Sequence, residues 1–310
     1  MTGAGVGFLR EARAGRRGPP VRVGGASGVA RLDVMSEAWA AARAAARAAA
    51  VDLRPLSTVE DAEQINAVLA ATWGGQRLDR EVIRALAVSG NVPWGAFDGD
   101  EMVGFVLGWA GVDAGGLHVH SHMLAALPDR RSGGAGYALK LAQRAQALDQ
   151  GISWMRWTFD PLVARNAWFN LGKLGAVIDG FERAFYGEMT DAINLGERSD
   201  RCTVAWDLRA PLGPRRGNVP SSTPAALARI DDGTWPRPAS VGSPEADLAV
   251  LEIPAEYHEL RADDPSLGRA WREAAAVAVE ACLGRGLVGV AFLRERSAYV
   301  FSRPDVRAPS

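Results

Sequence analysis

Residues 129 to 136 combine arginine and glycine in a pattern that suits the binding of an anion. Arg130 and Arg131 precede Ser132, and three glycines, Gly133, Gly134 and Gly136, follow with Ala135 between the last two. Glycines let backbone N–H groups turn toward one point, because no Cβ stands in the way. The next residues have the period of an amphipathic helix that ends at Gly151. Free N–H groups at a helix start favour phosphate or carboxylate, so the spacing predicts an anion site, with a purely structural glycine turn as the alternative.

Two common phosphate-binding motifs do not fit this segment. The phosphate loop of nucleotide hydrolases ends in Gly-Lys followed by Ser or Thr, whereas Lys140 lies inside the helix and is followed by Leu141. A dinucleotide-binding loop needs a third glycine where Leu139 stands. The anion must therefore be recognised by a different arrangement.

Three of the four histidines lie just before the glycine segment, in Leu117-His-Val-His-Ser-His122. Alternation along a strand puts His118, His120 and His122 on one face. Imidazole titrates near neutrality, so His120 or His122 could relay a proton. Histidines at this spacing could also ligate zinc, but no carboxylate or cysteine is near in sequence, and we expect no metal. Histidines that only satisfy backbone groups are the remaining alternative.

Hydrophobic periodicity, glycines and prolines predict the elements that position these residues. The expected order is a strand, two helices, three strands, a helix, a strand, a helix and two further strands. The ranges are a strand at 51–56, helices at 57–73 and 79–88, a hairpin at 94–109, a strand at 117–127, the helix after the glycines, a strand at 152–159, a helix at 163–174, and strands at 176–186 and 202–208.

This order, together with Arg131-x-x-Gly134-x-Gly136, resembles the GNAT superfamily of N-acetyltransferases over residues 51 to 209. The resemblance implies an α/β (α+β) fold with a mixed, mostly antiparallel sheet flanked by helices. It also implies acetyl-CoA as cosubstrate, held at its pyrophosphate by the glycine loop and the helix start. The residues it assigns to acetyl-CoA are Leu124, Ala126, Leu127, Arg131, Ser132, Gly133, Gly134, Ala135, Gly136 and Tyr137.

The resemblance implies an acyl-CoA-dependent N-acyltransferase in which a primary amine attacks the thioester directly. His120 and His122 are the candidate bases. The family's acid is a tyrosine whose place here is taken by Leu171, so Tyr186 is the candidate acid, with departure of the thiolate without an acid as the alternative. We expect a small-molecule or peptide amine as acceptor. Asp160 and Glu188 are carboxylates that could attract it, with a turn cap and a solvated strand end as the alternatives that are favoured for each taken alone. The alternative is a GNAT-fold module that binds CoA or a protein partner with little or no turnover.

Composition narrows the class of partner. The 310 residues are 48% hydrophobic and 23% charged, enough for one large or two small domains. A net charge of −1 gives no field for nucleic acid or an anionic membrane, while oligomerisation is possible. Cys202 and Cys282 lie in apolar surroundings, which predicts buried free thiols. No apolar run approaches the roughly 20 residues of a membrane span, so we expect a cytoplasmic protein.

The flanking segments differ from the central domain. Residues 1–34 are rich in glycine and arginine, and we expect them to be disordered or to precede the true start. An alanine-rich helix at 35–50 has little to bury and is expected to be solvated or weakly docked. A proline-rich linker at 210–247 leads to a small C-terminal α/β extension at 248–310, with an αββ unit that should dock on the first domain or a partner subunit, or complete a half-copy of the fold.

Overall fold

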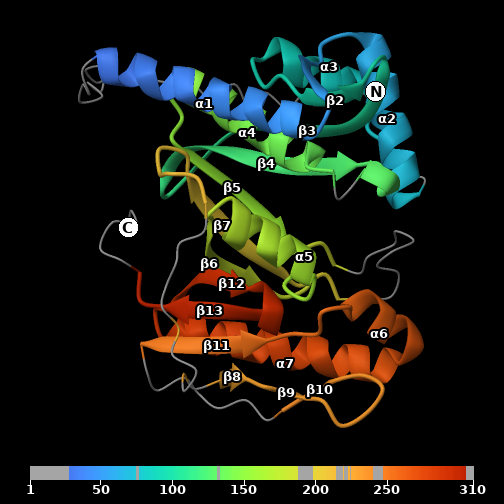
Figure 1. Cartoon of the computed structure of the whole chain (residues 1–310), viewed down its shortest axis with the longest axis vertical. Helices are drawn as coiled ribbons and strands as arrows, with labels where there is room; N and C mark the ends of the chain where they lie inside the picture. The colour runs from blue at the N-terminus through green and yellow to red at the C-terminus, as the bar shows by residue number, and fades with distance from the viewer. Residues whose placement is uncertain are drawn as a thin grey trace, which may run out of the picture.

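One sheet of eleven strands runs through the molecule (Figure 1). The computed structural model describes residues 28–74, 77–130, 133–187, 198–213, 219, 223, 225–239 and 247–304. The strand order is β1-β2-β3-β4-β5-β7-β6-β12-β13-β11-β8. These strands are β1 (Asp52–Pro55), β2 (Trp94–Asp98), β3 (Glu101–Asp113), β4 (Gly116–Ala126), β5 (Trp154–Phe159), β6 (Val177–Glu182), β7 (Arg201–Asp207), β8 (Ala225–Leu227), β11 (Leu248–Glu252), β12 (Val288–Leu293) and β13 (Ala298–Ser302).

Strand pairing is antiparallel except at two places. The pairs β4–β5 and β11–β8 are parallel, and all other pairs are antiparallel. The expected mixed, mostly antiparallel sheet is therefore confirmed. The parallel pair β4–β5 requires a crossover, which is the helix α4 (Ala135–Asp149) after the glycine segment.

Helices cover both faces of the first half of the sheet. Helix α2 (Val59–Trp73) begins at a capping box formed by Thr58 and Asp61, and α3 (Arg80–Val88) follows it. Leu107 of β3 packs in the core under α2, while its neighbour Val106 packs against Leu139 of α4. Because successive side chains of a strand point to opposite faces, α2 and α4 lie on opposite sides of the sheet.

Helix α1 (Gly28–Ala48) packs along α4. Ala38, Ala42 and Ala46 are buried, and their small side chains let the two helices approach closely. The Trp39 indole also donates a hydrogen bond to Asp149 of α4, with 2.7 Å between Nε1 and Oδ2. The expectation of a solvated or weakly docked helix is therefore wrong, and the helix begins inside the range 1–34 that was expected to be disordered.

The expected helix at 163–174 is divided into two parts. Residues Ala164–Ala167 form α5, and Trp168–Lys173 continue it as a π-helical segment, η2. The Trp168 ring lies on Gly172, where a Cβ would come within 2.2 Å of Cε3 of that ring. This close approach explains why glycine stands at that position.

The C-terminal strands continue the same sheet. Gly289 of β12 pairs with Ile178 of β6. Helix α7 (Pro265–Gly284) packs against β6, and α6 (Tyr257–Asp263) packs against α7, in the lower part of Figure 1. The expected strand, helix and terminal hairpin of the extension are present, joined to the first half through the β6–β12 pair. The division of the chain into domains stays a prediction.

The proline-rich segment wraps over the extension in its described part. It contains β8 and a small two-stranded sheet of β9 (Arg229–Ile230) and β10 (Arg237–Pro238). The Trp271 indole of α7 donates to the carbonyl oxygen of Pro236 at 2.7 Å, which ties the wrap to that helix.

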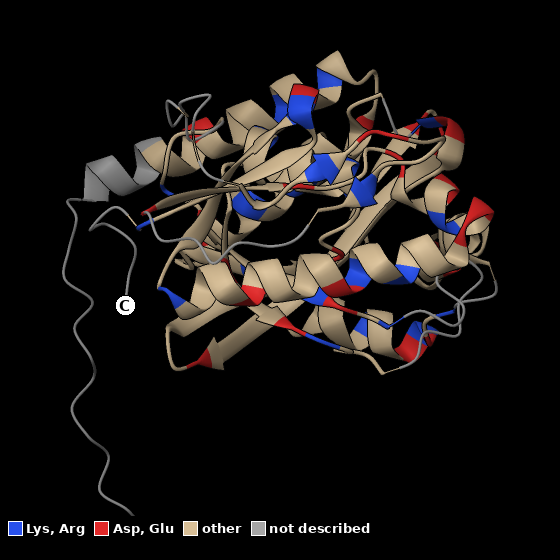
Figure 2. Ribbon diagram, turned by 90° about the horizontal axis from the view of Figure 1, so that it is seen from below, with Lys and Arg blue, Asp and Glu red and all other residues tan. Residues whose placement is uncertain are grey.

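Charges of both signs are interspersed over the fold (Figure 2). Within the described ranges, no helix has the length and apolarity needed to cross a bilayer. The two cysteines are buried and free, as expected, and burial raises the pKa of both thiols.

Candidate functional site

The sheet opens between β4 and β5. These two strands pair only at Val119 with Met155 and at His120 with Arg156. β4 continues six residues past His120 to Ala126, and β5 continues to Phe159, without further pairing between them. The edge of β4 beyond His120 therefore faces an opening in the sheet.

Backbone groups on that edge of β4 point into the opening. The N–H of Leu127 donates to the carbonyl oxygen of Val103 on β3 at 2.9 Å. Because N–H groups of an antiparallel strand alternate between its two sides, those of Leu124 and Ala126 point away from β3. Of the three residues assigned to acetyl-CoA here, Leu124 thus directs its N–H group to the opening, whereas the N–H of Leu127 is already bonded and Ala126 already has an interaction partner.

The glycine turn lies at the end of the same strand. A 3-10 turn at Pro128–Arg130 leads into it, and Gly134 adopts a left-handed φ of +93° as the residue that caps α4. A Cβ on Gly136 would lie 3.8 Å from Cδ2 of Leu124, so the helix start and the open edge of β4 are neighbours. Among the described residues, the N–H groups of Gly134, Ala135 and Gly136 have no hydrogen-bond acceptor.

The other residues assigned to the loop are placed differently. Arg131 and Ser132 lie outside the described residues. Arg130 is bound to the carboxylate of Asp98, so its charge is already paired. Tyr137 is half-buried against the core beside α4, and burial raises the pKa of its hydroxyl.

A β-bulge in β4 shifts the two candidate histidines. Leu107 of β3 pairs with Met123, but Gly108 pairs with Ser121, so His122 is an extra residue without a partner on β3. The rings of His120 and His122 both contact Trp109, with centroids 5.1 and 4.8 Å away. Trp109 packs with the α2 core, so both imidazoles lie on the α2 face of the sheet.

Burial favours the uncharged form of both imidazoles. Burial lowers the pKa of His120 to about 4, assisted by repulsion from His122, His118 and Lys140. Burial also lowers the pKa of His122. A neutral imidazole can accept a proton, which is what a base for the amine requires.

His118 is separate from this pair. Its Nδ1 lies 3.2 Å from the carbonyl oxygen of Gly116 and 3.8 Å from the Asp113 carboxylate. In the part of the chain that the structure describes, no group of three or more histidine, cysteine or acidic side chains could hold a metal ion.

A hollow of about 260 Å³ lies on the α2 face beside the bulge. Its lining comprises Leu69, Arg77, Leu78 and Met123, and Met123 directly follows the bulged His122. This hollow offers an apolar surface with one cation next to the histidine pair.

Tyr186 reaches the same face of the sheet from the turn after β6. Its hydroxyl oxygen lies 3.5 Å from Oγ1 of Thr158. His120 pairs with Arg156, and Thr158 is two residues further along β5, so Thr158 and both histidines share one face. Tyr186 is half-exposed, with the Arg201 guanidinium 5.4 Å from the centre of its ring.

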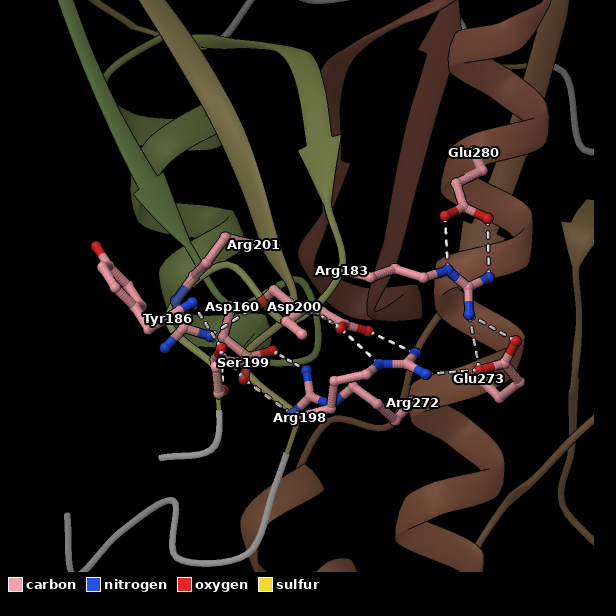
Figure 3. Close-up of polar contacts among 12 residues, drawn as sticks. Asp160, Arg183, Tyr186, Arg198, Ser199, Asp200, Arg201, Arg272, Glu273 and Glu280 are labelled. Atoms are coloured by element: carbon pink, nitrogen blue, oxygen red, sulfur yellow. Dashed lines mark hydrogen bonds and ion pairs between the residues drawn. The ribbon is translucent and has the colours of Figure 1, made fainter. Parts of the chain in front are cut away.

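A chain of polar contacts links Tyr186 to the C-terminal extension (Figure 3). Its backbone N–H donates to Oγ of the buried Ser199 at 2.8 Å. The next residue, Asp200, is also buried and accepts two hydrogen bonds from Arg198, at 2.7 and 2.8 Å. Arg198 in turn donates to Glu273 of α7 at 2.9 Å. Helix α7 thus supports the turn that carries Tyr186.

Asp160, expected to attract an amine, is instead part of a buried ion pair. Arg272 of α7 donates to both of its carboxylate oxygens, at 2.7 and 2.9 Å. Burial acts to raise the pKa of Asp160, but Arg272 and the hydrogen bonds to the carboxylate hold it below the ordinary value. Asp160 is therefore unavailable to a substrate, and that expectation is wrong. Glu188 lies outside the described residues.

Lys140 was not among the residues that the sequence singled out. It is 2% exposed, and its ammonium nitrogen lies 2.6 Å from Oγ of Ser121. The one signal in the sequence is rarity, because the chain has two lysines, Lys140 and Lys173, among 35 basic residues.

Comparisons with known proteins give only structural similarity. No protein-family model matches the chain, and no curated protein matches it. Similar solved structures include the ribosomal-protein-S18-alanine N-acetyltransferase from Escherichia coli, with 15% identity, a TM-score of 0.39, and coverage of 54% of this chain and 97% of that chain. Naa50 of Arabidopsis thaliana, in complex with a bisubstrate analogue, is 17% identical with a TM-score of 0.39, and the match covers 50% of this chain and 97% of that chain. The loading GNATL domain of CurA from Lyngbya majuscula is 16% identical with a TM-score of 0.39, and the match covers 51% of this chain and 98% of that chain.

These similarities are too low to establish a shared activity or acceptor. From β1 to β7 the chain forms a mostly antiparallel sheet with one parallel pair, β4–β5, joined through the glycine turn and α4.

Proposed function

We propose that the chain is an acyl-CoA-dependent N-acyltransferase that transfers acetyl from acetyl-CoA to a primary amine. The observation that supports this most strongly is the opening between β4 and β5 next to the glycine turn. A helix start with free N–H groups suits a pyrophosphate, and an open strand edge suits an extended chain that bears amides. Acetyl-CoA combines these two features in one molecule.

The backbone would position the thioester. The N–H groups of Gly134, Ala135 and Gly136 would bind the pyrophosphate, and that of Leu124 would bond to the arm or to the thioester carbonyl. A donor aimed at that oxygen stabilises the charge that develops on it. Holding the two reactants together supplies much of the remaining rate enhancement.

The histidine pair would prepare the acceptor. His120 and His122 are neutral and lie on the α2 face, beside the hollow lined by Met123. An amine is protonated at neutral pH, so it must lose a proton before it attacks, and an imidazole can accept that proton. Tyr186 lies on the same face as the candidate acid. The acceptor would be a small molecule or a peptide.

A second candidate is a module that binds CoA with little turnover. The observation in its favour is Leu171, which is fully buried and leaves no hydroxyl at the position of the family's acid. In that case CoA would bind but no amine would be acetylated.

Incubation with acetyl-CoA and a panel of primary amines tests the proposal. The panel should contain amino acids, polyamines, aminoglycosides and peptides with free N-termini. We expect thiol release that depends on one class of amine, with the acetylated product visible by mass spectrometry. CoA binding without any product would favour the binding module.

A further inference from the structure

Lys140 is unusual among the buried basic residues of this chain. Arg272, also buried, has a carboxylate partner in Asp160, and Arg144 donates to the carbonyl oxygen of Leu208 at 2.8 Å. Lys140 instead contacts a hydroxyl, an amide oxygen and a thioether: Ser121, Gln143 and Met155. No carboxylate lies within ion-pair distance of it in the described ranges.

Its nitrogen lies where β4 and β5 begin to separate. Ser121 directly follows His120, and Trp157 directly follows Arg156, the last paired residues of the two strands. The Lys140 nitrogen lies 2.6 Å from Ser121 Oγ and 3.9 Å from the centre of the Trp157 ring. The Lys140 nitrogen therefore lies at the apex of the opening. Lys140 belongs to α4, the helix that begins at the glycine turn.

The surroundings of Lys140 favour its neutral form. Burial holds its pKa well below the ordinary value. β5 contributes Met155 and Trp157, and α4 contributes Gln143, all uncharged. On β4, Ser121 is uncharged and His120 is an imidazole whose pKa is lowered to about 4, chiefly by burial. An arginine could not lose its proton here, whereas a lysine can.

The candidate acid Tyr186 lies on the α2 face of the sheet, so the α4 face of the opening has no proton carrier assigned to it. Leu171 occupies the position of the family's acid, and it lies next to Asn170, whose Oδ1 accepts a hydrogen bond from Trp157 Nε1 at 3.2 Å. Lys140 lies over the ring of that same tryptophan. Trp157 thus links Lys140 to Asn170, the residue that precedes Leu171.

We propose that Lys140 returns a proton to the departing thiolate of CoA. This inference rests on the proposed function. The acceptor nitrogen bonds to the thioester carbon and the carbon–sulfur bond breaks. The proton shed by that nitrogen passes to the neutral Lys140 amine, directly or through Ser121 Oγ, and then to sulfur. The products are an amide, a thiol and neutral lysine, so no further reactant is needed.

The reverse proton transfer provides a test that needs no acceptor. If Lys140 meets the sulfur, it can accept the thiol proton of bound CoA, so the thiolate should form at a lower pH than it would without the lysine. Thiolate absorbs in the ultraviolet, so its formation can be titrated with pH. CoA that lacks the sulfur atom, desulfo-CoA, supplies the blank.

The comparison uses Lys140→Met with Lys173→Met as the matched control, because Lys173 is the other lysine and is exposed. We expect bound thiolate to form at least one pH unit lower in wild type and Lys173→Met than in Lys140→Met, a tenfold change in acid dissociation. Equal CoA affinity with identical titrations in all three proteins would overturn the inference while leaving the proposed function intact. Absence of CoA binding by wild type would overturn both.

A second measurement on the wild-type protein covers the case in which Lys140→Met does not fold. With lysine labelled at carbon ε, the chain gives two NMR signals. We expect the Lys140 signal to move with CoA and not with desulfo-CoA, while the Lys173 signal stays in place. The same response to both ligands, or acetylation of Lys140 by acetyl-CoA detected by mass spectrometry, would refute the proton-carrier role.

Discussion

Removal of the Arg272 guanidinium should destabilise the whole molecule through Asp160. In Arg272→Met, the buried carboxylate loses two charge-assisted hydrogen bonds and keeps the Leu162 N–H at 2.9 Å and Arg201 at 3.8 Å. Breaking a buried pair from one side costs about 3–5 kcal/mol. Because two partners remain, we expect a loss of about 3 kcal/mol in the free energy of unfolding, at the lower end of that range.

The loss should depend on pH in a defined direction. In wild type the pKa of Asp160 is lower in the folded state than in the unfolded state, so the pair stabilises above the unfolded pKa and its contribution fades as pH falls through the folded value. In the variant, burial dominates and raises the folded pKa. Acid then protonates the carboxyl and removes the cost of a buried unpaired charge. The difference in the free energy of unfolding between variant and wild type should therefore shrink as pH falls from about 7 to about 4.

Urea denaturation followed by tryptophan fluorescence and circular dichroism measures this difference. Arg303→Met is the control, because Arg303 pairs with Asp247 on the surface and should cost less than about 1 kcal/mol. The double variant Asp160→Asn with Arg272→Met should recover part of the stability. A loss below about 1 kcal/mol for Arg272→Met, or a difference that does not narrow in acid, would refute the reasoning.

Three further predictions concern the site and its support. His120→Ala and His122→Ala should each lower acetyl transfer. The acid limb of the wild-type pH–rate profile should lie below the ordinary histidine range, because the pKa of His120 is about 4. An acid limb that is unchanged in both variants would assign the two histidines to a structural role. Glu273→Gln should reduce kcat and leave the acetyl-CoA KM unchanged, because Glu273 supports the turn of Tyr186 through Arg198. In a Tyr186→Phe background, Glu273→Gln should cause no further loss of kcat. Additive losses would contradict an effect of Glu273 through Tyr186. Ala42→Leu should lower the free energy of unfolding by about 1–3 kcal/mol in a thermal melt, because the larger side chain overpacks α1 on α4. The exposed control Ala44→Leu should leave the stability unchanged. Equal melting temperatures for the two variants would contradict the docking of α1.

Local signals in the sequence predicted most elements of the fold. The periodicity of the β3 and β4 strands, the glycine turn before α4, and Asp264-Pro265 at the start of α7 each act within a few residues. The mixed, mostly antiparallel sheet was predicted from a resemblance in element order. These features depend on neighbours in the chain, so the sequence displays them directly.

Features that depend on distant residues were not predictable. Asp160 looks like a turn residue until Arg272, 112 positions away, is placed beside it. The bulge at His122 depends on the register with β3, which periodicity does not encode. The alanines of α1 carry little apolar surface, so only the adjacent α4 shows that they are buried.

The position of Lys140 was hidden for the same reason. Helical periodicity places it beside the apolar face of α4 but does not reveal that two strands separate at its nitrogen.

Calorimetric titration of acetyl-CoA is the most direct test of the central claim. Gly134→Val is the matched variant, since Gly134 has a φ of +93° at the helix start, and Gly99→Val is its control, with a φ of +61° in the β2–β3 turn and open space around it. The account predicts saturable binding to wild type and Gly99→Val, and none to a folded Gly134→Val. Equal binding by all three proteins, or no binding by wild type, would contradict the assignment of the glycine turn and the adjoining opening to acetyl-CoA.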